Sequence, residues 1–441
     1  MSFFKWLYPG MHVKRWFGLL SVGITLISLG VAYLMVHMYR EQPFPEFVAY
    51  LTLQFVDRPL RGALFIASGL LVASLALMRL NKSLLSALLP AGMEDNIVDI
   101  VYQRRHLRQG PRVVAIGGGT GLSTLLRGLK EYTGNLTAIV TVADDGGSSG
   151  RLRRELGVLP PGDFRQCIVA LADAEPLMTR LFQYRFGEGS GLEGHSFGNL
   201  FIAAMSAITG NFEKALRESS RVLAVTGQII PSTLADVTLC AEFEDRVVSG
   251  ESAIPKTRRP IKRIFLQPSH VPAYPEAVRA ILQADLIVVG PGSLFTSVLP
   301  NLLVPDIVQS IRASGAVRIY VCNVATQEGE TEAFTVDDHV KALSAHLGPD
   351  VFDYVLANNN FSMAGELRGG AEMVALGDGA VDGRTYQVVT ADVINPEVPY
   401  RHDPKKLSHS IMQLFYDRVH AHNGKKSALL RTVHGVRSQL W

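Results

Sequence analysis

The sequence predicts an α/β protein with a Rossmann-like, doubly wound, mostly parallel sheet, preceded by two transmembrane helices. Short apolar runs alternate with helical patterns from Pro111 onward, and glycine-rich loops directly follow several of these runs. Continuous apolar runs are typical of strands covered by helices on both faces of a parallel sheet. Two long uncharged segments stand nearer the N-terminus. We therefore divide the chain into a membrane anchor at 1–82, with spans at about 16–38 and 62–80, a juxtamembrane linker at 83–110, the α/β domain at 111–420 and a basic tail at 421–441.

Composition narrows the classes of function. The chain has 441 residues, a formal net charge of +3 and three widely separated cysteines. A chain of this length usually holds more than one compact core, and so small a charge argues against a nucleic-acid partner. Because no cysteines are paired in spacing, zinc and disulfide frameworks lack support, and we expect a reducing compartment around the domain.

The two apolar segments predict membrane spans. Residues 16–38 carry no acidic or basic side chain except His37, and residues 62–78 are uncharged. A helix of about 20 apolar residues crosses a bilayer core of roughly 30 Å. Lysine and arginine flank the outer ends of both runs, so the positive-inside rule places both termini and the domain in the cytoplasm, at the cell (inner) membrane. Buried core helices are the alternative, but they would not explain the lack of charge.

Basic side chains next to the anchor and in the tail leave two interpretations open. Arg104, Arg105 and Arg108 of the linker can contact anionic headgroups or lie in solvent. The tail after Gly424 either lies on anionic lipid or is disordered.

The α/β domain contains a series of candidate strands. They are residues 113–116, 138–142, 264–266, 286–289, 317–322 and 352–356. Leu122, Leu125, Leu126 and Leu129 follow the i, i+3, i+4, i+7 spacing of a helix with one buried face. Ligands of doubly wound sheets bind beyond the carboxyl ends of the strands, so the loops that follow strands form the candidate site.

The first such loop contains Gly118, Gly119, Thr120 and Gly121. Glycines let backbone N–H groups approach an anion closely, and the helix that follows adds unpaired donors and a partial positive charge. The spacing is neither a full G-x-G-x-x-G, since Thr124 stands at the third glycine, nor a Walker A motif, since no lysine follows. A tight turn without a ligand is the alternative.

The second loop contains Asp144, Asp145, Ser148, Ser149 and Arg151. A carboxylate at this distance from the first loop is where dinucleotide-binding folds contact ribose hydroxyls. Adjacent carboxylates can also hold Mg²⁺, and serine and arginine can donate to phosphate. A flexible linker is the alternative.

A third region supplies Asp163 and Arg165, then His195 and Asn199 at the start of an apolar helix. We predict that these side chains face the ligand. An internal Asp163–Arg165 ion pair and a helix cap made by Ser196 are the plain alternatives.

Further strand ends extend the pattern. Gly290, Gly292 and Ser293 follow the apolar strand 286–289, and Asn323 ends the next strand. Glycine turns at strand ends can present N–H groups to an anion. Several such loops in one domain predict an extended ligand, whereas the zinc motif H-E-x-x-H is absent from the sequence.

These loops, in this order, resemble the YvcK/CofD-like family and its YvcK (gluconeogenesis factor) branch. The resemblance runs from about Arg112 to about Leu414. It depends on the segments VVAIGGGTGLSTLLRGLK, TAIVTVADDGGSSGRLRREL, PPGDFRQ, GHSFGNLFIAAM, VVSGES, IKRIFL, ADLIVVGPGSLFTSVLPNLLVP, YVCNVATQEGET and YRHDPKKL.

The resemblance implies that the chain binds UDP-sugars, notably UDP-N-acetylglucosamine, with no required cofactor. It also implies a regulatory role that links carbon metabolism during gluconeogenic growth to cell-wall precursor synthesis and cell shape. By motif, the ligand contacts would be Gly118 to Gly121, Asp144, Ser148, Ser149, Gly292, Ser293 and Arg401. A surface charge is the alternative for Arg401. The spans are an addition to the family pattern, and residues 358–383 lack a tyrosine expected in this branch.

Our leading hypothesis is a ligand sensor that contacts a cytoplasmic protein of wall-precursor synthesis, with a homo-oligomer left open. The competing hypothesis is a CofD-like phospho-lactyl transferase that acts on a deazaflavin precursor with a guanosine-linked donor and Mg²⁺. Asp144 and Asp145 would then bind the metal. A nicotinamide-dependent oxidoreductase has only the first glycine loop in its favour.

Overall fold

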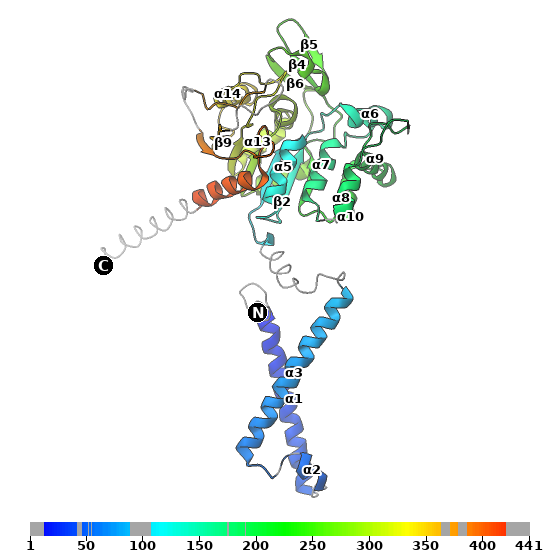
Figure 1. Cartoon of the computed structure of the whole chain (residues 1–441), viewed down its shortest axis with the longest axis vertical. Coiled ribbons are helices and arrows are strands. Elements are labelled where there is room, and N and C mark those ends of the chain that lie inside the picture. The colour runs from blue at the N-terminus through cyan, green and yellow to red at the C-terminus, as the bar shows by residue number, and fades with distance from the viewer. Residues whose placement is uncertain are drawn as a thin grey trace, which may run out of the picture. The chain divides into compact units, whose positions relative to one another are not determined.

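The computed structural model describes residues 13–41, 46–51, 53, 55–88, 107–173, 176–189, 191–362, 371–377 and 386–419. They fall into two compact units, Met1–His106 and Leu107–Trp441 (Figure 1). Most of the predicted linker, all of the predicted tail and part of segment 358–383 lie outside the described residues.

The first unit is helical. It contains α1 (Val13–Glu41), α2 (Glu46–Leu51) and α3 (Arg58–Leu88). Large apolar side chains such as Ile27 and Ile66 are exposed along α1 and α3. The window Arg58–Leu75 of α3 is long and apolar enough to cross a membrane, and Ser21–Leu34 of α1 is a shorter apolar stretch. Helices therefore form where the two spans were predicted, while insertion into a membrane stays a prediction.

The second unit contains a seven-stranded parallel sheet. Its strands lie in the order β10-β9-β8-β7-β1-β2-β3, and each neighbouring pair is parallel. The strands are β1 (Val113–Gly117), β2 (Leu136–Val140), β3 (Gln228–Pro231), β7 (Leu286–Val289), β8 (Val317–Val321), β9 (Tyr354–Asn358) and β10 (Gln387–Ala391). The chain builds outward from β1 to β3 and then returns to the other side of β1 with β7. The predicted doubly wound parallel sheet is confirmed, and its direction of winding reverses between β1 and β7.

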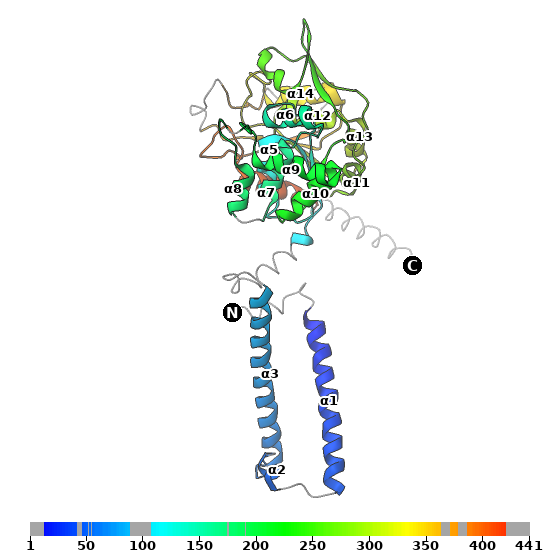
Figure 2. The ribbon, with the colours of Figure 1, turned by 90° about the vertical axis from the view of Figure 1, so that its right-hand side faces the viewer.

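Helices cover the sheet (Figure 2). They are α5 (Gly119–Leu129), α6 (Gly147–Leu156), α7 (Gly162–Leu171), α8 (Pro176–Gln183), α9 (Phe197–Thr209), α10 (Phe212–Val222), α11 (Pro275–Gln283), α12 (Leu299–Leu302), α13 (Pro305–Ala313), α14 (Val336–Leu347) and a helix over residues 404–419. The four leucines of α5 with helical spacing are fully buried, at 0% exposure each, so the predicted buried face is correct.

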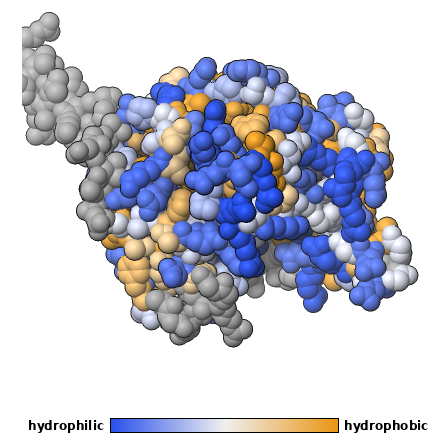
Figure 3. All heavy atoms as spheres, turned by 90° about the horizontal axis from the view of Figure 1, so that it is seen from above, coloured by the Kyte–Doolittle hydropathy of each residue, from blue (hydrophilic) through white to orange (hydrophobic). Residues whose placement is uncertain are grey.

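A second, smaller sheet is inserted between β3 and β7. It is antiparallel, in the order β5-β4-β6, and consists of β4 (Thr238–Glu242), β5 (Val247–Ser249) and β6 (Arg263–Gln267). Residues 264–266, predicted as a strand of the parallel sheet, belong instead to β6. The alternating burial along β6 is typical of a strand with one exposed face. Seen from above, this end of the domain is mostly hydrophilic, with smaller apolar areas (Figure 3).

Candidate functional site

A cavity of about 730 Å³ lies where β1, β7 and β8 end. This is the point at which the sheet reverses its winding, and doubly wound proteins bind ligands there. Its lining comes from the loops after β1, β2, β7 and β8, from α7, and from the segments that follow β5 and β10. The lining residues are 118–121, 291–293, 323–327, 400–402, Thr124, Thr141, Asp144, Asp163, Gln166, Glu251, Thr296, Ser297 and Ala371.

The β1 turn (residues 117–121) leads from β1 into α5. Gly118 is extended, and Gly119 has a φ of +61°, a left-handed conformation that favours glycine. A Cβ atom on Gly118 would lie 2.5 Å from the Asp163 carboxylate, so a larger residue would require the Asp163 side chain to shift. The Gly119 N–H donates to Asp163, whereas no described residue accepts from the N–H groups of Thr120 and Gly121. These two donors remain available at the N-terminus of α5.

Three pocket carboxylates, Asp144, Asp163 and Glu251, face the same cavity. Burial raises the pKa of Asp144, while the N–H of Gly146, which donates to its Oδ1 over 2.9 Å, partly offsets that rise. Burial, and then the charge of Asp144, raise the pKa of Asp163 to about 7 and that of Glu251 to about 8. Near neutral pH, Asp163 and Glu251 therefore spend much of the time protonated and uncharged.

Asp145 points elsewhere. Its Oδ1 accepts from the Ser252 N–H over 2.9 Å, and it does not line the cavity. Among the described residues, no group of three or more histidine, cysteine or acidic side chains is arranged to hold a metal ion. Asp144 and Asp145 therefore do not fit a shared Mg²⁺ site in this structure.

The β7 turn (residues 290–293) lies against the β1 turn and also lines the cavity. Gly292 exchanges two hydrogen bonds with Asn323: its N–H donates to Oδ1 over 3.2 Å, and its carbonyl accepts from Nδ2 over 2.9 Å. Ser293 Oγ accepts from Gln327 Nε2 over 2.8 Å. The Gly292 N–H, predicted to bind an anion, is therefore already used within the protein.

Glu330 holds the segment that follows the β7 turn. Its two carboxylate oxygens accept from the Phe295 N–H over 3.3 Å and from Thr296 Oγ1 over 2.9 Å. Burial raises the pKa of Glu330 to about 7, although these hydrogen bonds lower it in part.

The Arg401 loop (residues 393–403) closes one side of the cavity. Arg401 is exposed and lines the cavity, and its guanidinium carbon lies 5.5 Å from the centre of the Tyr400 ring. The backbone N–H of Arg401 donates to the Val398 carbonyl, and its own carbonyl accepts from the Asn395 N–H, each over 2.9 Å. These hydrogen bonds fix the backbone at Arg401, while its side chain lines the cavity.

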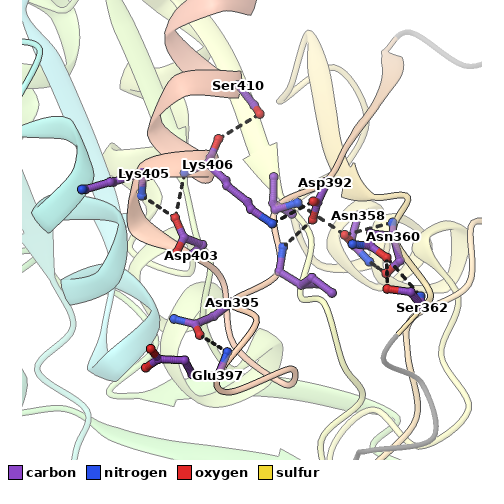
Figure 4. Close-up of polar contacts among 12 residues, drawn as sticks. Asn358, Asn360, Ser362, Asp392, Asn395, Glu397, Asp403, Lys405, Lys406 and Ser410 are labelled. Carbon is purple, nitrogen blue, oxygen red and sulfur yellow. Dashed lines mark hydrogen bonds and ion pairs between the residues drawn. The ribbon is translucent and has the colours of Figure 1, made fainter.

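The base of this loop is tied to its surroundings (Figure 4). Asp392 accepts from Lys406 Nζ over 2.7 Å. Asp403 begins the last helix by accepting from the N–H groups of Lys405 and Lys406, each over 2.9 Å. The family segment that ends in HDPKKL thus serves to fix the loop that carries Arg401.

A second group of predicted residues lies beside the cavity rather than in its lining. Ser148 Oγ lies 3.0 Å from His195 Nδ1 and accepts from Asn199 Nδ2 over 3.1 Å. Arg165 Nε donates to Asn199 Oδ1 over 2.9 Å. The buried network links α6, α7 and α9. The Ser196 cap is confirmed, because its side chain accepts from the Asn199 N–H.

The predicted site residues thus divide into two sets. The cavity is lined by Gly118, Gly119, Thr120, Gly121, Asp144, Asp163, Gly292, Ser293, Asn323 and Arg401. Outside the lining are Asp145, Ser148, Ser149, Arg151, Arg165, His195, Asn199 and Gly290. One residue of the second set supports the first, because Ser149 donates to Asp144. Arg151 donates instead to the carbonyl of Glu193, outside the lining, over 2.6 Å.

Sequence reasoning missed other lining residues. Glu251, Gln327 and His402 line the cavity without having been predicted as site residues. Each lies in a segment that carries the family resemblance, namely VVSGES, YVCNVATQEGET and YRHDPKKL. The family resemblance thus included these residues, but no local sequence pattern showed that their segments meet at the ends of β1 and β7.

The fold and the cavity define a doubly wound α/β protein with a ligand pocket at its switch point. A family model described as 2-phospho-L-lactate transferase CofD matches residues 113–394, and the chain belongs to this CofD family. Its relatives place it in the gluconeogenesis factor branch. The gluconeogenesis factor of Bacillus subtilis is 48% identical over 313 residues, 69% of this chain and 98% of the relative.

Two further comparisons extend this placement. A relative in Nostoc sp. is 47% identical over 440 residues, 96% of this chain and 94% of its own length. The crystal structure of a UPF0052 family member from Bacillus halodurans is 45% identical, with a TM-score of 0.66, and covers 69% of this chain and 99% of that chain.

Proposed function

We propose that the pocket binds a UDP-sugar, with UDP-N-acetylglucosamine as the leading candidate, and that occupancy regulates a protein partner. The observation that carries the proposal is two sets of donors that face one cavity and have no acceptor among the described residues. They are the N–H groups of Thr120 and Gly121 at the start of α5, and the Arg401 guanidinium. A diphosphate linked to a sugar and a base is long enough to use both. The cavity of about 730 Å³ is also within the usual range for small-molecule pockets.

The charges of the lining residues favour binding of an anionic ligand only near neutral or lower pH. Arg401 is the one lysine or arginine among the described lining residues, and it faces three pocket carboxylates. Two of these, Asp163 and Glu251, have pKa values of about 7 and about 8. When both are protonated, the pocket no longer repels a diphosphate strongly.

A regulatory role fits the lining better than nucleophilic catalysis does. The histidine of the described lining is His402, whose Nε2 lies 3.2 Å from the Cys322 carbonyl oxygen and is thus engaged. No described lining serine or threonine is hydrogen-bonded to an imidazole. Such a pocket can retain a ligand without converting it.

We further propose that α1 and α3 anchor the chain in the inner membrane, with the α/β unit in the cytoplasm. The exposed apolar side chains of both helices and the length of the Arg58–Leu75 window support this. The sensor would then contact a cytoplasmic protein of wall-precursor synthesis at the membrane.

The test is a calorimetric titration of the full chain in detergent with UDP-N-acetylglucosamine, beside UDP, GDP and NAD. We expect a selective UDP-sugar response with the ligand recovered intact. Arg401→Ala should weaken binding at least tenfold, about 1.4 kcal/mol. Arg418→Ala, an exposed arginine of the last helix outside the cavity, is the matched control and should bind normally. Equal affinity of the Arg401 variant would remove Arg401 from the site.

A CofD-like transferase is the second candidate. The three pocket carboxylates favour it, because such groups can steady charge near a diphosphate or take a proton. The misfit of Asp144 and Asp145 to one Mg²⁺ weighs against it. Transfer of a phospho-lactyl group from a guanosine-linked donor to a deazaflavin precursor, followed by mass spectrometry, would establish this function in place of the sensor.

A further inference from the structure

His402 is the residue of the Arg401 loop that follows Arg401, and its side chain is buried. Its exposed fraction is 7%, and its Nε2 lies 3.2 Å from the carbonyl oxygen of Cys322. Cys322 is the residue directly after β8. This hydrogen bond therefore ties the neighbour of Arg401 to a strand end that borders the cavity.

The ring is suited to a permanent donor role. A carbonyl oxygen can only accept, so the proton of His402 resides on Nε2. Burial lowers the pKa of His402 to about 4. Across ordinary pH the ring stays neutral, and the hydrogen bond does not depend on a proton taken from solvent.

The same strand end also holds the β7 turn. Asn323, the next residue, exchanges two hydrogen bonds with Gly292, at 2.9 Å and 3.2 Å. The segment that follows β8 thus fixes two parts of the pocket wall, the β7 turn through the Asn323 side-chain amide and the Arg401 loop through the Cys322 main-chain carbonyl.

The other hydrogen bonds and the ion pair of the Arg401 loop stabilise the loop itself or its base. Those made by the backbone of Arg401 to Asn395 and Val398 shape the loop internally. The Asp392–Lys406 ion pair and the Asp403 cap fasten its base (Figure 4). The bond of His402 joins the residue beside Arg401 to the cavity wall itself.

We propose that His402 is a positioning residue, whose hydrogen bond to the Cys322 carbonyl holds the Arg401 guanidinium at the ligand pocket. The inference rests on the proposed function, because it requires Arg401 to contact the bound UDP-sugar. It adds a residue whose effect on binding passes through Arg401.

The experiment is a double-mutant cycle on the full chain, with UDP-N-acetylglucosamine affinity as the readout. His402→Ala should weaken binding about tenfold, since the loop loses its tie to β8. In an Arg401→Ala background, His402→Ala should cause little further loss, because its effect passes through Arg401. Additive losses from the two changes would overturn the inference.

Conservative variants separate positioning from general support of the fold. His402→Gln carries an amide donor that can reach the carbonyl, whereas His402→Asn is too short to do so. We expect the glutamine variant to bind within about threefold of the unmodified chain and the asparagine variant to bind like alanine. The glutamine and asparagine variants also test the positioning role if the alanine variant does not fold. Equal affinities of these two variants would contradict the inference.

His339→Ala is the matched control. His339 is likewise buried, and its Nδ1 lies 2.9 Å from the Thr335 carbonyl oxygen, but it is on α14 outside the cavity. It should lower the melting temperature without changing affinity. If the unmodified chain fails to bind, the proposed function falls and this inference with it. If the chain binds, Arg401→Ala weakens binding and His402→Ala does not, the inference alone falls.

Discussion

The β1 turn and the β7 turn are two glycine-rich connections that look alike in sequence and lie against each other in space. Each follows a buried parallel strand and leads into a helix. A Cβ atom on Gly121 would lie 2.4 Å from the Pro291 carbonyl oxygen, which shows how closely their backbones approach. In the β1 turn, no described residue accepts from the N–H groups of Thr120 and Gly121. In the β7 turn, Asn323 accepts from the Gly292 N–H, and just after the turn Glu330 accepts from the Phe295 N–H.

We interpret the β1 turn as the one that binds the ligand and the β7 turn as the one that mainly supports the fold. Glycine content allows a backbone to approach an anion, but the anion also needs donors that the protein has not used. A carboxylate of this chain, Glu330, already lies at the start of the helical segment after the β7 turn. We therefore expect changes to the β1 turn to affect ligand binding and those to the β7 turn to affect stability first.

Gly121→Ala should have the largest effect. The added methyl group would meet the main chain of Pro291 and Gly292, which cannot move aside as a flexible side chain could. Such overpacking destabilises a fold by about 3 kcal/mol or more when backbone must shift. Thermal unfolding of the full chain should show a clear fall in melting temperature, together with loss of UDP-sugar binding.

Gly315→Ala is the control for that change. No atom lies within 4 Å of a Cβ built at Gly315, so the substitution should leave both stability and affinity nearly unchanged. Normal binding by the Gly121 variant would show that the two turns can separate and that their close contact is not required.

The parallel sheet was predictable where strands are buried on both faces. β7 has four consecutive buried residues, and the predicted range 286–289 matches it. β3 and β10 lie at the two edges of the sheet. β3 was missed because it has only four residues and ends in Pro231, and β10 because none of its residues is fully buried. A short edge strand lacks the continuous apolar run by which β7 is recognised.

From the sequence, only the site residues that lie at the ends of predicted strands could be predicted. The β1 turn and Asn323 lie at the carboxyl ends of strands, so the general rule for doubly wound sheets predicts them. Glu251 follows β5 of the inserted sheet and reaches the cavity through tertiary folding alone. Nor could the sequence show which N–H groups are used, because Glu330 and Phe295 are 35 residues apart.

Glu330→Ala should have the next largest effect and act mainly on the β7 turn. It leaves the Phe295 N–H and Thr296 Oγ1 without their acceptor in a buried place, at a cost of about 2 kcal/mol. Glu330→Gln should lose much less, because its amide oxygen can accept from Phe295 while Thr296 accepts from the amide nitrogen. Denaturant unfolding of both variants measures the difference, and equal losses would argue against this role of the carboxylate.

The pH dependence of affinity should reveal the carboxylate that lies at the β1 turn. Asp163 accepts from the Gly119 N–H and has a pKa of about 7, and Glu251 nearby has a pKa of about 8. Both are mainly neutral below these values and negative above them. A rise in pH from about 6 to 8.5 should therefore weaken UDP-sugar binding, by about tenfold if one added charge acts at pocket range. Asp163→Asn should flatten part of this profile, and an unchanged profile would show that Asp163 does not titrate with the ligand.

Ser293→Ala should have the smallest effect, because it tests the β7 turn at a hydrogen bond that opens onto the cavity. The change removes the acceptor of Gln327 Nε2, which lies 2.8 Å away, but the freed amide can turn to solvent in the pocket. We expect a loss of about 1 kcal/mol in stability, near the ordinary net value of one hydrogen bond. Ser410→Ala, which removes a hydroxyl bonded within the last helix, provides a matched control for the loss of a serine. A loss of UDP-sugar affinity larger than the loss of stability would mean that Ser293 contacts the ligand, and the β7 turn would then bind as well as support.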